Sequence, residues 1–298
     1  MFYGAIQANK TKTVFLMIGF GIAILAIGWA VGVLMNGGEL AWVIALVLAV
    51  LLVWGSYYNS DKLVIASVGA VEADRLREPY LVNVVEGLSI AAGFPTVPKT
   101  YIMESEALNA FATGRNPEHA AICVTRGLLN KLERYELEGV IGHEMSHIRN
   151  YDTLIMTMTA VLVGGVAILS RLMWRWMFWG GGGRSRKSNS GGGGAQMILI
   201  VVAIALIIIA PILLTIMKFA LSRNREYLAD ASAVQLTRNP DGLINALKRI
   251  SSDAEPLEGA SDATAHLFIA NPLKSKVVSN MFSTHPPIED RIAALKNL

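Results

Sequence analysis

The sequence predicts a mostly α-helical membrane protein with four apolar helices, together with an α+β domain that lies outside the bilayer and contains a small sheet. Three observations lead to this fold class. Of the 298 residues, 53% are hydrophobic and only 16% are charged, whereas soluble domains have roughly 25% charged residues. Long apolar runs alternate with stretches of soluble composition. Short, partly β-branched runs bounded by turn residues indicate strands in the first soluble stretch.

The first two apolar runs are predicted to form a membrane hairpin. Residues 14–35 are long enough to cross a bilayer of about 30 Å as a helix, and Lys10 and Lys12 precede them. Residues 41–58 follow, with aromatic residues near both ends, as is typical of membrane interfaces. Because lysine and arginine concentrate on the cytoplasmic side, the charged flanks predict that the amino terminus and the next soluble stretch face the cytoplasm.

The remaining chain continues this alternation. We divide it into four regions, which are a membrane hairpin at 1–58, the first part of a soluble domain at 59–152, a second apolar hairpin at 153–221, and the second part of the soluble domain at 222–298. The first soluble part reads as a helix, a small sheet and a second helix, and the last part as mostly helical.

The second hairpin contains apolar runs at 154–170 and 197–217, separated by a Gly- and Ser-rich linker at 180–194. Such a linker is flexible and has no core of its own. If both runs cross the bilayer, the arginines and lysine of the linker lie outside the cell, against the positive-inside tendency. The alternative, that this region does not cross, therefore stays open.

The sequence HEMSH at residues 143–147 predicts a metal site on a helix. His143 and His147 are four residues apart and therefore lie on one helical face. Imidazole nitrogens bind zinc at about 2.0–2.1 Å, and a catalytic site needs a third protein ligand and an open fourth position. Glu144 lies beside the metal, where a carboxylate can accept a proton from water. The alternative is a surface helix with two incidental histidines.

A second helix offers the missing ligand. Glu226 and Asp230 are one helical turn apart in SRNREYLADASAV. The first carboxylate can ligate the ion, and the second can orient a histidine, which fixes its tautomer and raises its basicity. A solvated helix charge is the alternative for Glu226 when it is considered alone.

These motifs carry a resemblance to a known family. GHEMSH together with SRNREYLAD resembles the membrane-embedded zinc metalloproteases of the HtpX heat-shock protease family, which are relatives of the CAAX prenyl proteases. LNAFATG and VTRGLL also match the pattern of that family, and the resemblance covers nearly the whole chain. It implies a zincin-like protease domain that binds one Zn²⁺ per chain. It also implies that His143, His147 and Glu226 are ligands, that Glu144 is the general base, and that Asp230 supports a ligand.

Other candidates have weaker support. The resemblance implies that His285 lies near the site, where an imidazole could stabilise an oxyanion, with turn capping as the alternative. It also suggests Asn109 and Ala110 as a strand edge that binds substrate, with an ordinary sheet strand as the alternative. We expect structural roles for His119 and His266. The single cysteine, Cys123, is expected to be a buried strand residue, and it excludes an intrachain disulfide.

The predicted function is that of a zinc-dependent endopeptidase anchored in the cell (inner) membrane by several spans. The resemblance implies cleavage of damaged or unassembled membrane proteins on the cytoplasmic side, in membrane quality control. The small net charge of +3 gives no indication of nucleic-acid binding. One alternative is an intramembrane protease, which the charged flanks of the motif disfavour. Another is a zinc-binding scaffold without activity, in which Glu144 would have no task.

Overall fold

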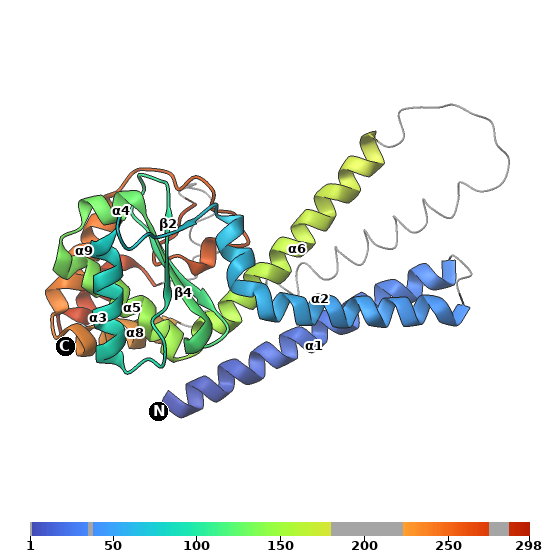
Figure 1. The fold of residues 1–298 in the computed structure, drawn as a ribbon, viewed down its shortest axis with the longest axis horizontal. Helices are drawn as coiled ribbons and strands as arrows, with labels where there is room; N and C mark the ends of the chain where they lie inside the picture. The colour runs from blue at the N-terminus through green and yellow to red at the C-terminus, as the bar shows by residue number, and fades with distance from the viewer. Residues whose placement is uncertain (1, 35–37, 180–222, 274–285) are drawn as a thin grey trace.

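The computed structural model describes residues 2–34, 38–179, 223–273 and 286–298. A globular part is built around a small sheet, and long helices project from one side of it (Figure 1). The predicted span at 197–217, the linker at 180–194 and His285 lie outside the described residues.

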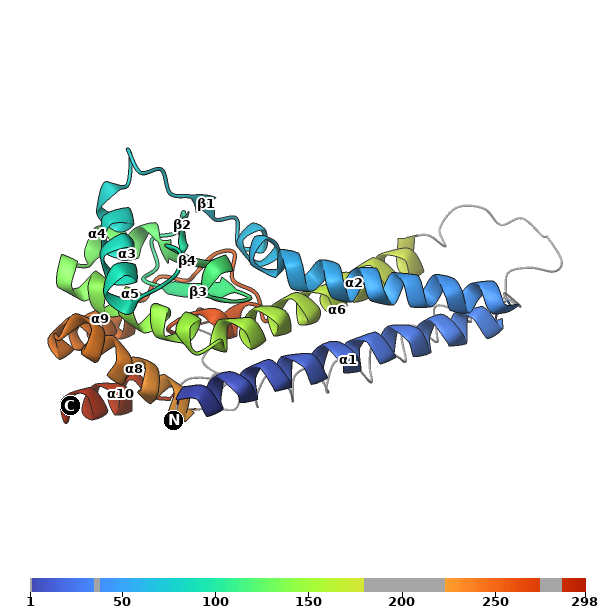
Figure 2. The ribbon, with the colours of Figure 1, turned by 60° about the horizontal axis from the view of Figure 1, so that its bottom comes forward.

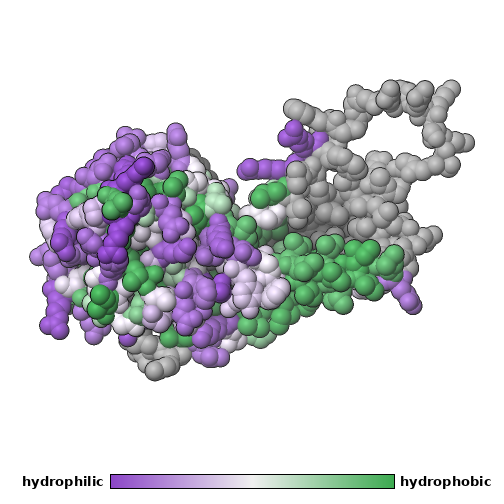
Figure 3. Space-filling model, viewed as in Figure 1, coloured by the Kyte–Doolittle hydropathy of each residue, from purple (hydrophilic) through white to green (hydrophobic). Residues whose placement is uncertain are grey.

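Two helices form the predicted first hairpin. Helix α1 (Phe2–Leu34) and helix α2 (Gly38–Ser67) pack against each other and extend away from the globular part (Figure 2). Each is long and apolar enough to cross a membrane, over Ile6–Ala26 in α1 and Trp42–Ser67 in α2. Their outer surface is hydrophobic (Figure 3), as expected for helices whose solvent is lipid. Helix α2 continues past the predicted end of the hairpin at residue 58.

The predicted third span is part of helix α6 (Asp152–Trp179). Among the described helices, α6 meets the length and hydropathy requirements of a span only together with α5 (Arg134–Arg149), and this pair is bent by 84°. The first turns of α6 are buried in protein, because Leu154, Met158 and Leu162 pack in one cluster with Leu16 of α1. The described part of the chain therefore shows two spans, or three with the bent pair, and the fourth predicted span lies outside it.

The small sheet is present and has mixed topology. Its strands are β1 (Val71–Glu72), β2 (Lys99–Met103), β3 (Ala110–Gly114) and β4 (Ala120–Thr125), in the order β1-β2-β4-β3. Strands β2 and β4 are parallel and the other pairs are antiparallel. Three of these strands lie in the runs that the sequence indicated, whereas β1 was not predicted. Cys123 is buried in β4, as expected.

Helices cover the sheet and complete the globular part. They are α3 (Pro79–Ala92), α4 (Arg126–Lys131), α5, α8 (Arg223–Thr237), α9 (Pro240–Ser252) and α10 (Ile288–Leu295), with short 3-10 turns at Pro117–His119 and Ala265–Leu267. One hydrophobic core joins α3, the sheet, α5 and α9. Helix α5 lies at its centre, and so the HEMSH sequence is in a buried helix and not in a surface helix.

Helix α5 is fixed at its start and along its side. Glu133 and Glu136 form a capping box, in which the N–H of Glu133 donates to Glu136 Oε2 at 2.8 Å, so that end groups of the helix are satisfied. Gly139 of α5 then packs directly on the start of α9, where a Cβ would lie 2.6 Å from the backbone nitrogen of Leu243. The absence of a side chain at Gly139 therefore sets the distance between α5 and α9.

We expect Gly139→Ala to lower the free energy of unfolding by about 1–3 kcal/mol, as overpacking of a core does, because the new methyl group has no space beside Leu243. Gly87→Ala on α3 is the matched control, since no atom outside its own helix lies within 4 Å of the added Cβ. This change should be neutral or stabilise by up to about 1 kcal/mol through helix propensity. Chemical denaturation of the two variants measures both effects, and equal stability would show that α5 and α9 are not held as described.

Candidate metal centre

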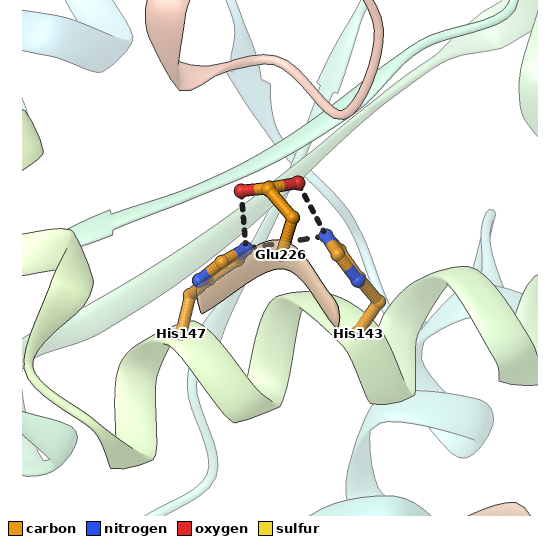
Figure 4. A group of neighbouring side chains, drawn as sticks. All are labelled: His143, His147 and Glu226. Atoms are coloured by element: carbon orange, nitrogen blue, oxygen red, sulfur yellow. Dashed lines mark hydrogen bonds and ion pairs between the residues drawn. The ribbon is translucent and has the colours of Figure 1, made fainter. Parts of the chain in front are cut away.

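Helices α5 and α8 bring three potential metal ligands to one point. His143 and His147 lie one turn apart on α5, and Glu226 extends from the first turn of α8 above both rings (Figure 4). The two Nε2 atoms are 3.1 Å apart. Glu226 Oε1 lies 3.5 Å from Nε2 of His147, and Oε2 lies 3.8 Å from Nε2 of His143. The structure thus brings together the three residues that the sequence suggested as ligands.

The close packing of α5 on α8 explains this convergence. Gly142 faces Ala233 and Thr237 of α8, with no side chain to separate the helices. Gly142 thus packs on the last turns of α8, while Glu226 reaches the histidines from its first turn, and all three candidate ligands are buried.

Each imidazole is held from behind by a carboxylate. His143 Nδ1 lies 2.8 Å from Asp230 Oδ1, and His147 Nδ1 lies 3.0 Å from Asp152 Oδ2. A carboxylate accepts hydrogen bonds, so the Nδ1 atoms donate. Both Nε2 atoms are thereby oriented toward Glu226 and are available to a metal ion. The pairing of Asp230 with a histidine matches the expectation, whereas Asp152 was missed, although it begins the helix next to the motif.

The donor set fits a zinc ion. Ligands at about 2.0–2.1 Å from zinc in tetrahedral geometry are about 3.3 Å from each other. The observed separations of 3.1, 3.5 and 3.8 Å are close to this value. Among the described residues, this is the one group of His, Cys, Asp or Glu side chains that is suited to hold a metal ion. Two nitrogens and one carboxylate oxygen are also ligands that zinc commonly accepts.

Arg291 of α10 supplies positive charge behind the site and was not found from the sequence. It is fully buried. Its guanidinium donates to both oxygens of Asp230, at 2.6 and 2.9 Å, and to the carbonyl oxygen of Ile269 at 3.2 Å. Its Nη1 lies 3.7 Å from Glu226 Oε2. A bidentate pair of this kind fixes the carboxylate that orients His143. From one sequence alone, an arginine on a short amphipathic helix would be predicted to be exposed to solvent.

The two histidines differ in their charge preference. Burial and the nearby Arg291 lower the pKa of His143 to about 4. Burial opposes the charged form of His147 as well, but the hydrogen bond to Asp152 and the charge of Glu226 outweigh it and raise its pKa to about 9. In the metal-free protein at neutral pH, His147 is therefore protonated and His143 is neutral.

Glu144 lies on the same helix between the two histidines and is buried. Burial raises the pKa of its carboxyl to about 7, and the charge of Glu226 adds to the shift, while the charge of His147 and a hydrogen bond from the backbone N–H of Ala112 oppose it. A carboxyl with a pKa near neutrality is suited to both accept and return a proton.

The outer edge of β3, which does not pair with β4, runs past Glu144. Part of this edge is hydrogen-bonded to another segment of the same chain. The carbonyl oxygen of Ala110 accepts from the N–H of Ile269 at 2.9 Å. The amide of Asn109 holds Ala270, with Nδ2 donating to its carbonyl oxygen at 3.0 Å. The two residues suggested as a substrate edge thus contact residues 269–270 in this structure.

Of the other histidines, His119 and His266 lie within the described residues, and neither is part of the site. His119 is exposed, and its Nδ1 lies 2.9 Å from Asn116 Oδ1. His266 is buried, and its Nε2 lies 3.0 Å from the carbonyl oxygen of Met156. Both have the structural surroundings that we expected.

Zinc affinity should depend on pH in a defined direction. Because the pKa of His147 is about 9 in the metal-free protein, zinc must displace one proton at neutral pH. Its dissociation constant should therefore rise about tenfold per unit of decreasing pH between pH 9 and pH 7. Below pH 7 the dependence should steepen, as the metal-free protein also protonates Glu144. Competition with a chromophoric chelator measures this, and an affinity that stays constant would remove His147 from the ligand set.

This chain is similar to a protein family and to several known proteins. Residues 75–298 match the family described as peptidase family M48. A protein named "Protease HtpX homolog" from Listeria monocytogenes serotype 4b is 49% identical over all of both chains. One of the same name from Dictyoglomus thermophilum is 45% identical over 99% of this chain and 94% of its own. A crystal structure of S. mikatae Ste24p aligns with 98% of this chain and 66% of its own, with 18% identity and a TM-score of 0.49.

The family match covers strands β2–β4, the HEMSH helix and the helix of Glu226, and full-length relatives share nearly half of the residues. These are the parts of the chain that build the candidate metal centre. The chain therefore belongs to peptidase family M48, a family of metalloproteases.

Proposed function

We propose that this protein is a membrane-anchored, zinc-dependent endopeptidase that acts on the cytoplasmic side of the membrane. The observation that carries the proposal is the convergence of three buried ligands, His143, His147 and Glu226, with a buried Glu144 on the same helix. This arrangement supplies three protein ligands and leaves a fourth position open, as catalytic zinc sites require.

The chain's own groups account for the proton transfers of peptide hydrolysis. When bound, zinc polarises the scissile carbonyl and lowers the pKa of water to about 7. Glu144 accepts the proton from the attacking water and delivers it to the leaving amine. Asp230 and Asp152 keep the Nδ1 protons of the two histidines in place during these steps. From the resemblance, we also propose that His285 stabilises the oxyanion.

We propose that substrate binds in extended form along the outer edge of β3, where main-chain hydrogen bonds hold a peptide without demanding a sequence. Asn109 and Ala110 remain the proposed contacts, and a peptide that uses them must displace residues 269–270. The N–H of Ala112 points toward Glu144 on the same edge. A peptide paired with β3 would therefore pass directly over the catalytic carboxylate.

The proposed substrates are damaged or unassembled membrane proteins, as the relatives' family implies. The hydrophobic surface of helices α1 and α2 (Figure 3) supports this, since an apolar anchor of this kind would keep the attached metal centre close to the bilayer. Such a position favours proteins that are themselves inserted in the membrane. We propose the cell (inner) membrane as the location.

Two other functions have less support. An intramembrane protease would carry its motif inside hydrocarbon, and the bent pair of α5 and α6 could be counted as one span. Helix α5, however, begins with Arg134 and Glu136 and packs on α8, α9 and β3 inside the globular part. Charged residues of this kind are costly in the bilayer. If the protein were a zinc-binding scaffold without activity, Glu144 would have no function in it.

Glu144→Gln separates an enzyme from a scaffold. The substitution keeps the shape of the side chain and removes its basicity, so zinc content should stay near one ion per chain. Proteolysis should fall by at least about 10²–10⁴-fold, the range typical of general acid–base catalysis. Zinc content and casein cleavage are measured on the same purified sample.

The matched control is Glu138→Gln, on the same helix and paired with Arg134 at the protein surface. It should keep both zinc and activity. A zinc-loaded Glu144→Gln variant that cleaves casein at the rate of the unchanged protein would exclude Glu144 from the mechanism.

The proposed orientation is testable by labelling, because Cys123 is buried and burial raises the pKa of its thiol. A cysteine placed at the exposed Glu118 (Glu118→Cys) should react with a membrane-impermeant maleimide only after the cells are opened. Ser188→Cys in the linker should react in intact cells if residues 153–221 cross the bilayer twice. Labelling of Glu118→Cys in intact cells would contradict the cytoplasmic orientation, and unlabelled Ser188→Cys would contradict the second hairpin.

A further inference from the structure

The turn between α5 and α6 presents Asp152 to His147, and a side chain of α1 holds this turn. Asn9 is buried at the start of α1, with 2% of its surface exposed. Its Nδ2 donates to Asp152 Oδ1 at 2.7 Å and to the carbonyl oxygen of Asn150 at 3.0 Å. One amide from the first apolar helix therefore bonds the residues on both sides of Tyr151.

The backbone of this turn is in an unfavourable conformation. Tyr151 has a φ of 58°, in the left-handed region that bulky residues rarely adopt. Such a conformation persists only where surrounding contacts determine it. Helix α1 provides these contacts, since Lys10 Nζ also lies 4.2 Å from the centroid of the Tyr151 ring. All three residues of the turn are thus contacted from α1.

Arg225 joins this network to the other half of the metal centre. Its Nη1 donates to Asn9 Oδ1 at 2.8 Å and to Asp152 Oδ1 at 3.1 Å. It directly precedes Glu226 in α8, and Figure 2 shows the N-terminal end of α1 beside α8. The same cluster of side chains therefore supports the carboxylate behind His147 and the helix turn that carries the third ligand.

We propose that Asn9 is a positioning residue of the metal centre, so that zinc is held tightly only when α1 is docked against the turn at residues 150–152. This inference rests on the metal site proposed above. Asn9 and Arg225 both bond Asp152 Oδ1, and this leaves Oδ2 to His147. Without Asn9, Oδ1 of the carboxylate loses one of its two donors, and Arg225, the other donor, loses its contact with Asn9 Oδ1. The carboxylate is then held less firmly, and the hydrogen bond that orients Nε2 of the imidazole is weakened. The apolar helix is on this account part of the scaffold of the site as well as an anchor.

Asn9→Leu in the full-length protein tests the proposal, because leucine has a similar size and cannot form hydrogen bonds. Zinc affinity should fall at least about tenfold, at the low end of the 10–100-fold typical of residues that support ligands. Asn9→Ser, which keeps a small polar group, should give a smaller loss and serves if the leucine variant does not fold. Thr13→Val is the matched control, since Thr13 is buried one turn further along α1 and donates to the carbonyl of Asn9 in its own helix.

A second set of variants separates positioning from general stability. If Asn9 acts through Asp152, then Asp152→Ala should weaken zinc binding at least as much as Asn9→Leu. Adding Asn9→Leu to Asp152→Ala should then change the affinity by less than about twofold, because coupled residues are not additive. The melting temperature of the metal-free proteins is measured in parallel.

The outcomes are distinct. A lower melting temperature with unchanged zinc affinity in Asn9→Leu would reduce Asn9 to a packing residue, and additive losses in the double variant would exclude the route through Asp152. His147→Ala tests the underlying site separately. Zinc affinity that is unaffected in His147→Ala would overturn the metal centre itself and not only its link to α1.

Discussion

The candidate metal centre depends on hydrogen bonds behind the two imidazoles. Asp230 and Asp152 occupy the Nδ1 sides of His143 and His147, and both rings therefore turn their Nε2 atoms toward Glu226. An imidazole on a helix could otherwise rotate about its side-chain bonds and present either nitrogen. Each of these carboxylates is in turn held by a buried or partly buried arginine, Arg291 or Arg225. The geometry of the site is therefore set by four helices and not by the HEMSH helix alone.

The distribution of charge follows from the same arrangement. Several carboxylates are buried close together, which would be costly without compensation. Arg291 offsets this cost on the side of His143 by contacting Asp230 and Glu226. On the side of His147, the hydrogen bond to Asp152 and the charge of Glu226 raise the pKa of the imidazole, so the protonated form is favoured when no metal is bound. A divalent cation would be attracted by the same carboxylates, so a metal ion and the proton compete for this side of the pocket.

Much of this fold and site could be predicted from the sequence, because local patterns encode them. The first hairpin follows from the length of its apolar runs, and His143, His147 and Glu226 follow from helical spacing and residue chemistry. The structure differs where tertiary packing decides. The start of α6 is apolar enough to suggest a span, yet Met158 and Leu162 bury against α1. The sequence around Asp152, Arg291 and Asn9 does not indicate which residues they contact, because their partners come from segments far away in the chain. No periodicity or motif indicates that an asparagine near residue 10 meets an aspartate near residue 152.

The separation of the ligands along the chain affects when the site can form. During synthesis the ribosome produces α5, with both histidines, well before α8, and the apolar region up to residue 221 lies between them. A nascent chain that has reached α6 therefore holds only two of the three donors and lacks Asp230 and Arg291 behind them. Two histidines alone bind zinc weakly, so the full donor set exists only after α8 and α10 have been synthesised. The centre therefore forms late, because its third donor and the groups behind His143 come from helices that follow α6 in the chain.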